Sequence, residues 1–109
     1  MQDPNQIEVP PSFVALYASP SGHRLTQPMS EVRERYELCE DLAQMLTEHA
    51  AMTEARTGAP GREVLLTMQR ALEGSESSVR PVEAVWVVRR LAELLGWEWP
   101  HDGTSGEPG

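Results

Sequence analysis

The sequence contains no lysine, and all nine of its basic side chains are arginines. A lysine is required by the phosphate-binding loop GxxxxGK[ST] and by enzymes that form a Schiff base with their substrate. The composition therefore excludes both kinds of site. The bias itself needs no functional cause, because GC-rich coding favours arginine over lysine.

Cysteine is almost as scarce, since Cys39 is the only one and has no partner for an intrachain disulfide. The first residues, MQDPNQ, lack the basic and apolar regions of a secretory signal. No apolar run approaches the roughly 18 residues that cross a bilayer. We therefore expect a cytoplasmic protein that does not enter the membrane.

Positive charge is also in short supply. The 109 residues include 17 acidic side chains and carry a net charge of −8, with an isoelectric point near 4.8. Binding to nucleic acid or to an anionic membrane requires clustered basic residues. We expect neither partner. A hydrophobic fraction of 39% is ordinary for one small globular domain.

Five of the nine prolines fall within residues 1–29, which we interpret as an N-terminal arm. Inside it, PPSFVALYA places Pro11 at the start of a short helix, with Phe13, Leu16 and Tyr17 on one face. The arm is too apolar to be a free tail. We expect four apolar side chains of the arm to pack against the rest of the protein, namely Ile7, Val9, Phe13 and Leu16.

The longest expected helix begins at the N-cap Ser30, continues to about Arg56 and is stopped by Gly58. Its apolar face covers about half of the circumference and comprises Val32, Tyr36, Cys39, Leu42, Ala43, Leu46 and Ala50. A helix with a single neighbour needs a narrower face. We therefore expect two packing partners. Leu38, Met45 and Met52 follow one flank at intervals of seven residues.

Two further helices follow the turn GAPG. One begins near Pro60 or Gly61 and ends at Glu73, and the other begins at Pro81 and is closed by Gly96. No segment alternates for long enough to predict a strand. The expected fold class is all-α, a small three-helix bundle over residues 30–99 with a shared apolar interior. The polar, glycine-rich residues 100–109 are expected to form a disordered tail.

The last expected helix, EAVWVVRRLAELLGW, carries a tryptophan on the side where a helical wheel predicts charge. Its core stripe comprises Ala84, Val87, Val88, Leu91, Leu94 and Leu95. The opposite side combines an apolar pair with two arginines, Val82, Trp86, Arg89 and Arg90. Tryptophan and arginine commonly anchor interfaces, and an exposed apolar patch usually indicates binding. We predict that these four residues bind a partner protein.

Two alternatives stay open for this patch. The chain itself could cover Trp86, either through the docked arm or through Trp97 and Trp99. A small molecule could instead bind beneath the tryptophan, in a pocket between the arm and the bundle. Either alternative would change what the position of Trp86 on the helical wheel implies for function, but neither would change the predicted fold.

Three stretches together resemble a set of small uncharacterised bacterial proteins: PPSFVALY, RYELCEDLAQMLTEHA and, most specifically, EAVWVVRRLAELLGW. The resemblance spans roughly residues 8–98. Some of these proteins carry the automatic label "ATPase with chaperone activity". The present chain lacks the phosphate-binding loop and any lysine, so we do not carry the ATPase part across. The word chaperone in this label implies no more than binding to another protein.

No arrangement of residues predicts chemistry. Cys39 faces the expected core, where a thiol is inert, and His49 lies at its edge without a carboxylate at ligand spacing. No nucleophile signature accompanies His23, His49 or His101. The GAPG turn is weakly similar to the loop of KH domains, and a helix-turn-helix is conceivable, but both need a basic surface. We expect no catalytic residues, no metal and no cofactor.

A second surface is acidic. Glu37, Asp41 and Glu48 lie opposite the apolar face of the long helix, where they can be merely solvated or can steer a basic partner. We predict a non-catalytic protein–protein interaction module, an adaptor or chaperone-like protein. One alternative is a ligand-binding protein or enzyme with a pocket between arm and bundle. Another is a homodimer joined through Leu38, Met45 and Met52.

Overall fold

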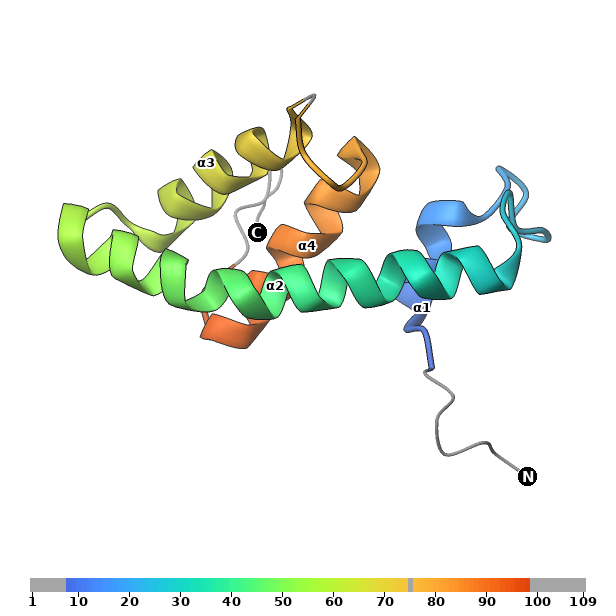
Figure 1. Ribbon diagram of the computed structural model, residues 1–109, viewed down its shortest axis with the longest axis horizontal. Helices are drawn as coiled ribbons and strands as arrows, with labels where there is room; N and C mark the ends of the chain where they lie inside the picture. Colours follow the sequence, from blue (N-terminus) through green and yellow to red (C-terminus); the bar gives the residue numbers. More distant parts are fainter. Residues whose placement is uncertain (1–7, 75, 99–109) are drawn as a thin grey trace, which may run out of the picture.

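The computed structural model describes residues 8–74 and 76–98 and is all-α in this part of the chain, as predicted. In chain order the elements are the short helix α1 (Pro11–Val14), the 3-10 turn η1 (Ala15–Tyr17), and the helices α2 (Met29–Thr57), α3 (Gly61–Glu73) and α4 (Pro81–Leu95) (Figure 1). The predicted contact of Ile7, the cover by Trp99 and the tail at 100–109 lie outside the described residues.

The N-cap of the long helix α2 lies two residues before the predicted one. Pro28 is its N-cap, with an extended backbone, and the Pro28 carbonyl accepts hydrogen bonds from the amides of Glu31 and Val32, both at 3.0 Å. Ser30 therefore lies inside the first turn rather than at the cap, because the fixed φ of proline already sets the entry geometry. The helix ends as predicted at Gly58, whose φ of 75° is left-handed.

The boundaries of α3 and α4 agree with the sequence. Pro81 occupies the first position of α4, and Gly96 closes it with a left-handed φ of 73°. Gly61 begins α3 for a different reason. A Cβ atom at this position would lie 2.9 Å from the ring of Trp97, so only glycine admits this contact between the start of α3 and the end of α4.

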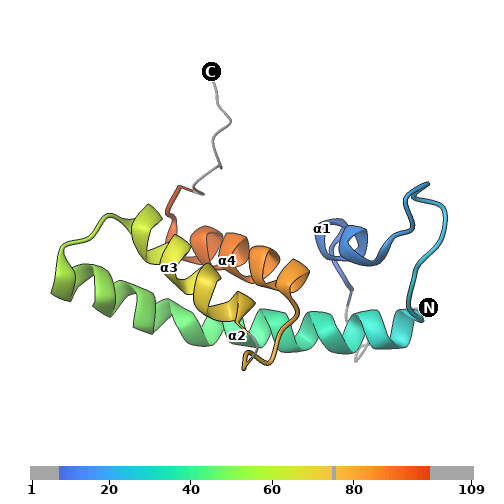
Figure 2. The same ribbon diagram turned by 90° about the horizontal axis from the view of Figure 1, so that it is seen from above.

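Helix α2 is a rod along one side of the molecule, and α3 and α4 pack side by side against it (Figures 1 and 2). The prediction of two packing partners for α2 is confirmed. The arm, comprising α1 and η1, lies against the N-terminal half of α2 (Figure 2). Among the described residues, no helix is both long and apolar enough to cross a bilayer.

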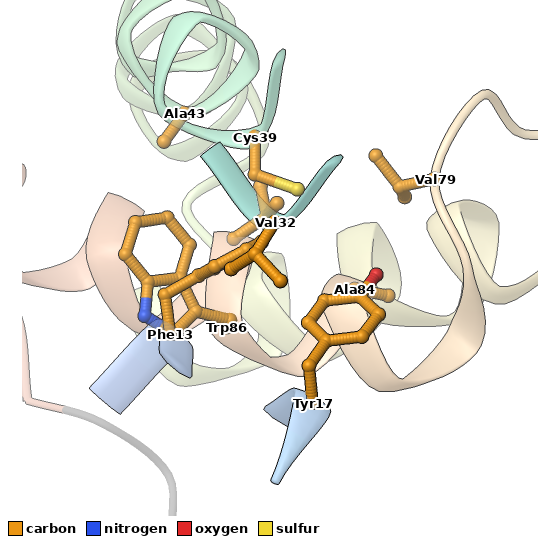
Figure 3. Packing of buried hydrophobic residues seen from close by; sticks show 9 residues of the cluster. Phe13, Tyr17, Val32, Cys39, Ala43, Val79, Ala84 and Trp86 are labelled. Carbon is orange, nitrogen blue, oxygen red and sulfur yellow. The ribbon is translucent and has the colours of Figure 1, made fainter. Parts of the chain in front are cut away.

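The interior consists of two apolar clusters. The first joins the arm to α2 and α4, and Figure 3 shows Phe13 and Tyr17 of the arm beside Val32, Cys39 and Trp86. The second joins α3 to α2 and α4 and contains Ala50, Val64, Leu65, Met68, Val88, Leu91 and Ala92, with Trp97 packed against it. The arm is therefore part of the core, as its apolar residues predict.

The single thiol is enclosed in the first cluster. Cys39 has no exposed surface, and burial raises its pKa to about 12. A thiol reacts through its thiolate, so both the burial and the raised pKa suppress its reactivity. The prediction that Cys39 is an inert core residue is consistent with this environment.

The reactivity of Cys39 should report on global unfolding. At pH 8 we expect iodoacetamide to alkylate the native protein about a thousandfold more slowly than the urea-unfolded protein, because the thiolate is both rarer and shielded. Intact mass over time measures the rate, and no other thiol interferes. Alkylation of the native protein at the unfolded rate would contradict a closed first cluster.

Candidate functional site at the junction of arm and bundle

A carboxylate lies inside the molecule where the sequence predicted a wholly apolar interior. Glu83 in the first turn of α4 has no exposed surface. Arg35 of α2 donates to it twice, from Nε to Oε2 at 2.9 Å and from Nη2 to Oε1 at 2.5 Å. The Tyr17 hydroxyl of the arm donates to Oε2, and the backbone N–H of Arg80 donates to Oε1 at 2.9 Å. The prediction of an apolar interior is wrong at this point.

These donors explain why the carboxylate is stable there. Burial alone would raise the pKa of Glu83, but the hydrogen bonds from Arg35, from the Arg80 amide and from Tyr17 outweigh it and hold the pKa below its ordinary value. Burial and the same carboxylate raise the pKa of Tyr17. Glu83 is therefore ionised at neutral pH, and Tyr17 keeps its proton.

An outer ring of contacts extends this cluster towards solvent. Arg80 Nη1 donates to the Tyr17 hydroxyl at 3.0 Å, and Arg35 Nη2 donates to the Ser78 carbonyl at 3.2 Å. Arg80 also faces Glu31 at 3.4 Å. Tyr17, Arg35, Arg80 and Glu83 thus connect the arm, α2, the loop before α4 and α4 itself. Both oxygens of Glu83 accept hydrogen bonds from Arg35, Tyr17 and the Arg80 amide, so the cluster ties the arm, α2 and α4 together.

Trp86 follows three residues later, and the arm covers it. Only 8% of the residue is exposed, and its Nε1 donates to Ser12 Oγ at 2.9 Å. The ring makes edge contacts with Phe13 and Tyr36, at centroid distances of 5.1 and 5.7 Å. The prediction that Trp86 presents an open patch is therefore corrected. A wheel of one helix does not include a third segment that packs on its outer side.

The other three residues of the predicted patch have different environments. Val82 is half exposed, and Arg89 is exposed. Arg90 is half buried and pairs with Glu40 of α2 at 2.9 Å and with Glu93 at 3.1 Å. The four residues do not form one continuous apolar surface. Three of them meet instead at a hollow.

This hollow, which we name the arm hollow, lies between the arm and the bundle and has a volume of about 420 Å³. Trp86, Arg89 and Arg90 line it together with residues of the arm, of α2 and of α4, namely Glu8, Pro10, Ser12, Leu16, Tyr36, Glu40, Val85 and Glu93. Val82 is not among them. The structure thus unites most of the predicted site residues, but around a hollow rather than on a convex patch.

The lining of the arm hollow is partly apolar and partly charged. Tyr36, Trp86 and Leu16 give it apolar and aromatic walls. Its charged groups are three acids, Glu8, Glu40 and Glu93, and two arginines, of which Arg90 pairs with both Glu40 and Glu93. Burial would raise the pKa of Glu40, but hydrogen bonds from Arg90 and Gln44 lower it below its ordinary value. The described lining contains neither a histidine nor a cysteine, the residue types that most often supply a base or a reactive thiolate near neutral pH.

The predicted acidic surface is exposed. Glu37, Asp41 and Glu48 all face solvent along α2, on the side away from the core residues Cys39 and Ala43. This surface is separate from the arm hollow, whose α2 members are Tyr36 and Glu40. In the described part of the chain, no group of three histidine, cysteine or acidic side chains is arranged to hold a metal ion.

The residues that hold the arm on the bundle were not predicted from the sequence. Glu83 had a local signal, since it precedes Val87 by four residues and so shares its buried face. It also stands three residues after the N-cap Arg80, the position at which a glutamate accepts from the N-cap amide. Tyr17 and Ser12 had no such signal, because their partners lie 66 and 74 residues away in the sequence.

Comparisons with protein-family models, with curated proteins and with solved structures find no match for this chain. Its function is therefore argued from the geometry of the site.

The Glu83 cluster should make stability depend on pH. Since the folded pKa of Glu83 is lowered, its contribution is present above the unfolded pKa of about 4.3 and is lost as pH falls through the folded pKa. We expect Glu83→Gln to lower the free energy of unfolding by about 2 kcal/mol at pH 7, moderated because a fifth of the Arg35 side chain remains exposed. Urea titrations at pH 7 and pH 3 measure the difference, which should shrink at pH 3.

The exposed Glu76 provides the matched control. Glu76→Gln should change stability by no more than about 0.5 kcal/mol at either pH. A loss for Glu83→Gln that is equal at both pH values would contradict an ionised, hydrogen-bonded carboxylate in the core.

Truncation of Trp86 should act as a core mutation. We expect Trp86→Ala to cost about 3–5 kcal/mol of stability and Ser12→Ala about 1 kcal/mol, because the latter removes only the acceptor of the indole N–H. Val82→Ala, one turn earlier on the same side of α4 but half exposed, should stay within about 0.5 kcal/mol. Urea unfolding followed by circular dichroism gives all three values. Unchanged stability of Trp86→Ala would instead favour an open surface.

Proposed function

We propose that this protein is a non-catalytic protein–protein interaction module, adaptor or chaperone-like, whose partner inserts a side chain into the arm hollow. The observation that carries the proposal is the lining itself. One hollow of about 420 Å³ combines the aromatic rings of Trp86 and Tyr36 with the guanidinium groups of Arg89 and Arg90. Tryptophan, tyrosine and arginine are the residue types that supply most binding energy at protein interfaces.

The construction of the arm hollow supports recognition. Its walls come from the arm, α2 and α4, and the Glu83 cluster and the Trp86–Ser12 hydrogen bond hold the arm in place. A site that is formed before binding does not have to be ordered by its partner, which lowers the free-energy cost of association. The volume suits one or two inserted side chains rather than a whole domain.

In the described part of the chain, the side chains that could act as a nucleophile or an acid are buried or hydrogen-bonded. Their environments support a binding role rather than catalysis. Cys39 is enclosed with a raised pKa, and Glu83 is enclosed with both oxygens hydrogen-bonded. The carboxylates Glu40 and Glu93 in the hollow accept from Arg90. The buried free thiol also suits a reducing compartment, which is why we place the protein in the cytoplasm.

A small-molecule ligand is the second candidate for the same hollow. Its volume lies within the range of about 300–1,000 Å³ that is usual for ligand pockets, and its walls combine apolar and polar groups. A compound library tested by thermal shift identifies this case, because a specific ligand raises the melting temperature through mass action.

The test of the proposal starts from the full chain, immobilised and screened against a random phage-displayed peptide library. Isothermal titration calorimetry with the selected peptides then compares the wild type with Arg89→Glu, in the wall of the arm hollow, and with Arg70→Glu, an exposed arginine on α3. We expect Arg89→Glu to weaken binding at least about tenfold and Arg70→Glu less than about twofold.

Equal affinities for the two variants would contradict the proposal and would place the selected peptides elsewhere. A compound that stabilises the wild type but not Arg89→Glu, in the absence of any selected peptide, would assign the arm hollow to a small molecule instead.

A further inference from the structure

Helix α2 carries a row of exposed apolar side chains that neither cluster absorbs. Leu38, Met45 and Met52 are 36%, 69% and 58% exposed, and the two methionines are the most exposed large hydrophobic residues that the structure describes. They are spaced by seven residues, so they lie in one line about 21 Å long on the helix. Isolated apolar residues are normal on a surface, whereas three of them aligned on one helix are a candidate for a binding face.

The row follows the side of α2 that the other helices leave uncovered. Helices α3 and α4 pack side by side on one side of the rod, and the arm also lies against it (Figure 2). The core-facing residues of α2, Val32, Cys39, Ala43 and Ala50, are all buried, whereas the three residues of the row belong to neither core cluster. The row is therefore not required to close the interior.

Acidic side chains border this row on one flank. Asp41 lies three residues after Leu38 and four before Met45, and Glu48 stands in the same relation to Met45 and Met52. Residues three and four apart are neighbours on a helix surface, so each carboxylate lies beside the line of apolar side chains. Glu34 and Glu37 extend the acidic flank by one turn, and all four acids are exposed.

From this arrangement we propose that the outer face of α2 binds a basic amphipathic helix of a partner protein. The apolar row would receive leucine-like side chains at helical spacing, while the acidic flank pairs with lysine or arginine beside them. Methionine suits this role, because its unbranched, polarizable side chain adapts to different apolar surfaces. Attraction between the acidic flank and a basic helix would also speed association at low salt.

The charge of α2 decides against a second copy of this chain as the occupant. The helix has seven acidic residues and three arginines, a net charge of −4. Two copies packed along the row would bring two such helices together, each with Asp41 and Glu48 beside the contact. Like charges across an interface disfavour the complex, and the opposite charge on the partner removes this penalty.

This surface shares no residue with the arm hollow, so the two proposals stand or fall separately. The probe is a fluorescein-labelled synthetic peptide of about 18 residues, built from leucine and lysine with all leucines on one helical face. A second peptide of the same composition has an order that breaks this periodicity. Fluorescence anisotropy with the full chain at about 0.15 M salt measures binding of each.

We expect the amphipathic peptide to bind the wild type at least about tenfold more tightly than the scrambled one. Met45→Gln should weaken its binding about tenfold, whereas Ala51→Gln, an exposed position on another side of α2, should change it less than about twofold. Arg89→Glu should leave it unchanged, because Arg89 lies at the arm hollow.

Charge is tested with two matched double variants. Asp41→Lys with Glu48→Lys should weaken binding and flatten its salt dependence, while Glu63→Lys with Glu73→Lys changes the net charge equally on α3 and should retain both.

Three results would overturn the proposal. Equal binding of the periodic and scrambled peptides would show attraction by net charge alone. Equal affinities for Met45→Gln and Ala51→Gln would place binding elsewhere. A wild type that sediments as a dimer, with Met45→Gln as a monomer, would give this face to a second copy.

Discussion

The contact on which the arrangement depends is the buried ion pair between Glu83 and Arg35. It joins the first turn of α4 to α2, and it recruits the Tyr17 hydroxyl from the arm and the backbone of Arg80 from the preceding loop. A carboxylate without exposed surface is stable only if its charge is paired and its oxygens are hydrogen-bonded. Four directed donors converge on Glu83, whereas apolar contacts lack this directionality, so the cluster favours one arrangement of α4 on α2.

The hydrogen bonds that hold the arm also bear on the shape of the surface beside α4. Tyr17 is hydrogen-bonded to Glu83 and Ser12 to the indole of Trp86, so the arm is attached to the first two turns of α4. The arm hollow lies beside Arg89 and Arg90, further along the helix. Because arm residues form part of its lining, the shape of the hollow would be lost if the arm detached. The recognition that we propose at this site would therefore depend on the same interactions that hold the arm on the core.

Local rules predicted most of the fold, and they did so residue by residue. Gly58, Pro81 and Gly96 mark helix ends because each restricts or frees the backbone in a way that neighbours scarcely influence. The wheel of α4 was wrong about Trp86 because it describes one helix, whereas the environment of Trp86 is set by Ser12 and Phe13, more than 70 residues earlier. Glu83 was missed for a related reason. Its type predicts exposure, and only the arrival of Arg35 and Tyr17 makes burial favourable.

The two faces of α2 are subject to different constraints. On the inner face the small side chains of Cys39, Ala43 and Ala50 let α3 and α4 approach closely, so size is restricted at each position. On the outer face, packing does not restrict the size of the side chains, and a polar residue in place of Met45 would not disturb the core. A polar residue at this exposed position would also favour solubility. The fold alone does not account for Leu38, Met45 and Met52 beside an acidic flank, and this is why we propose a partner for the outer face.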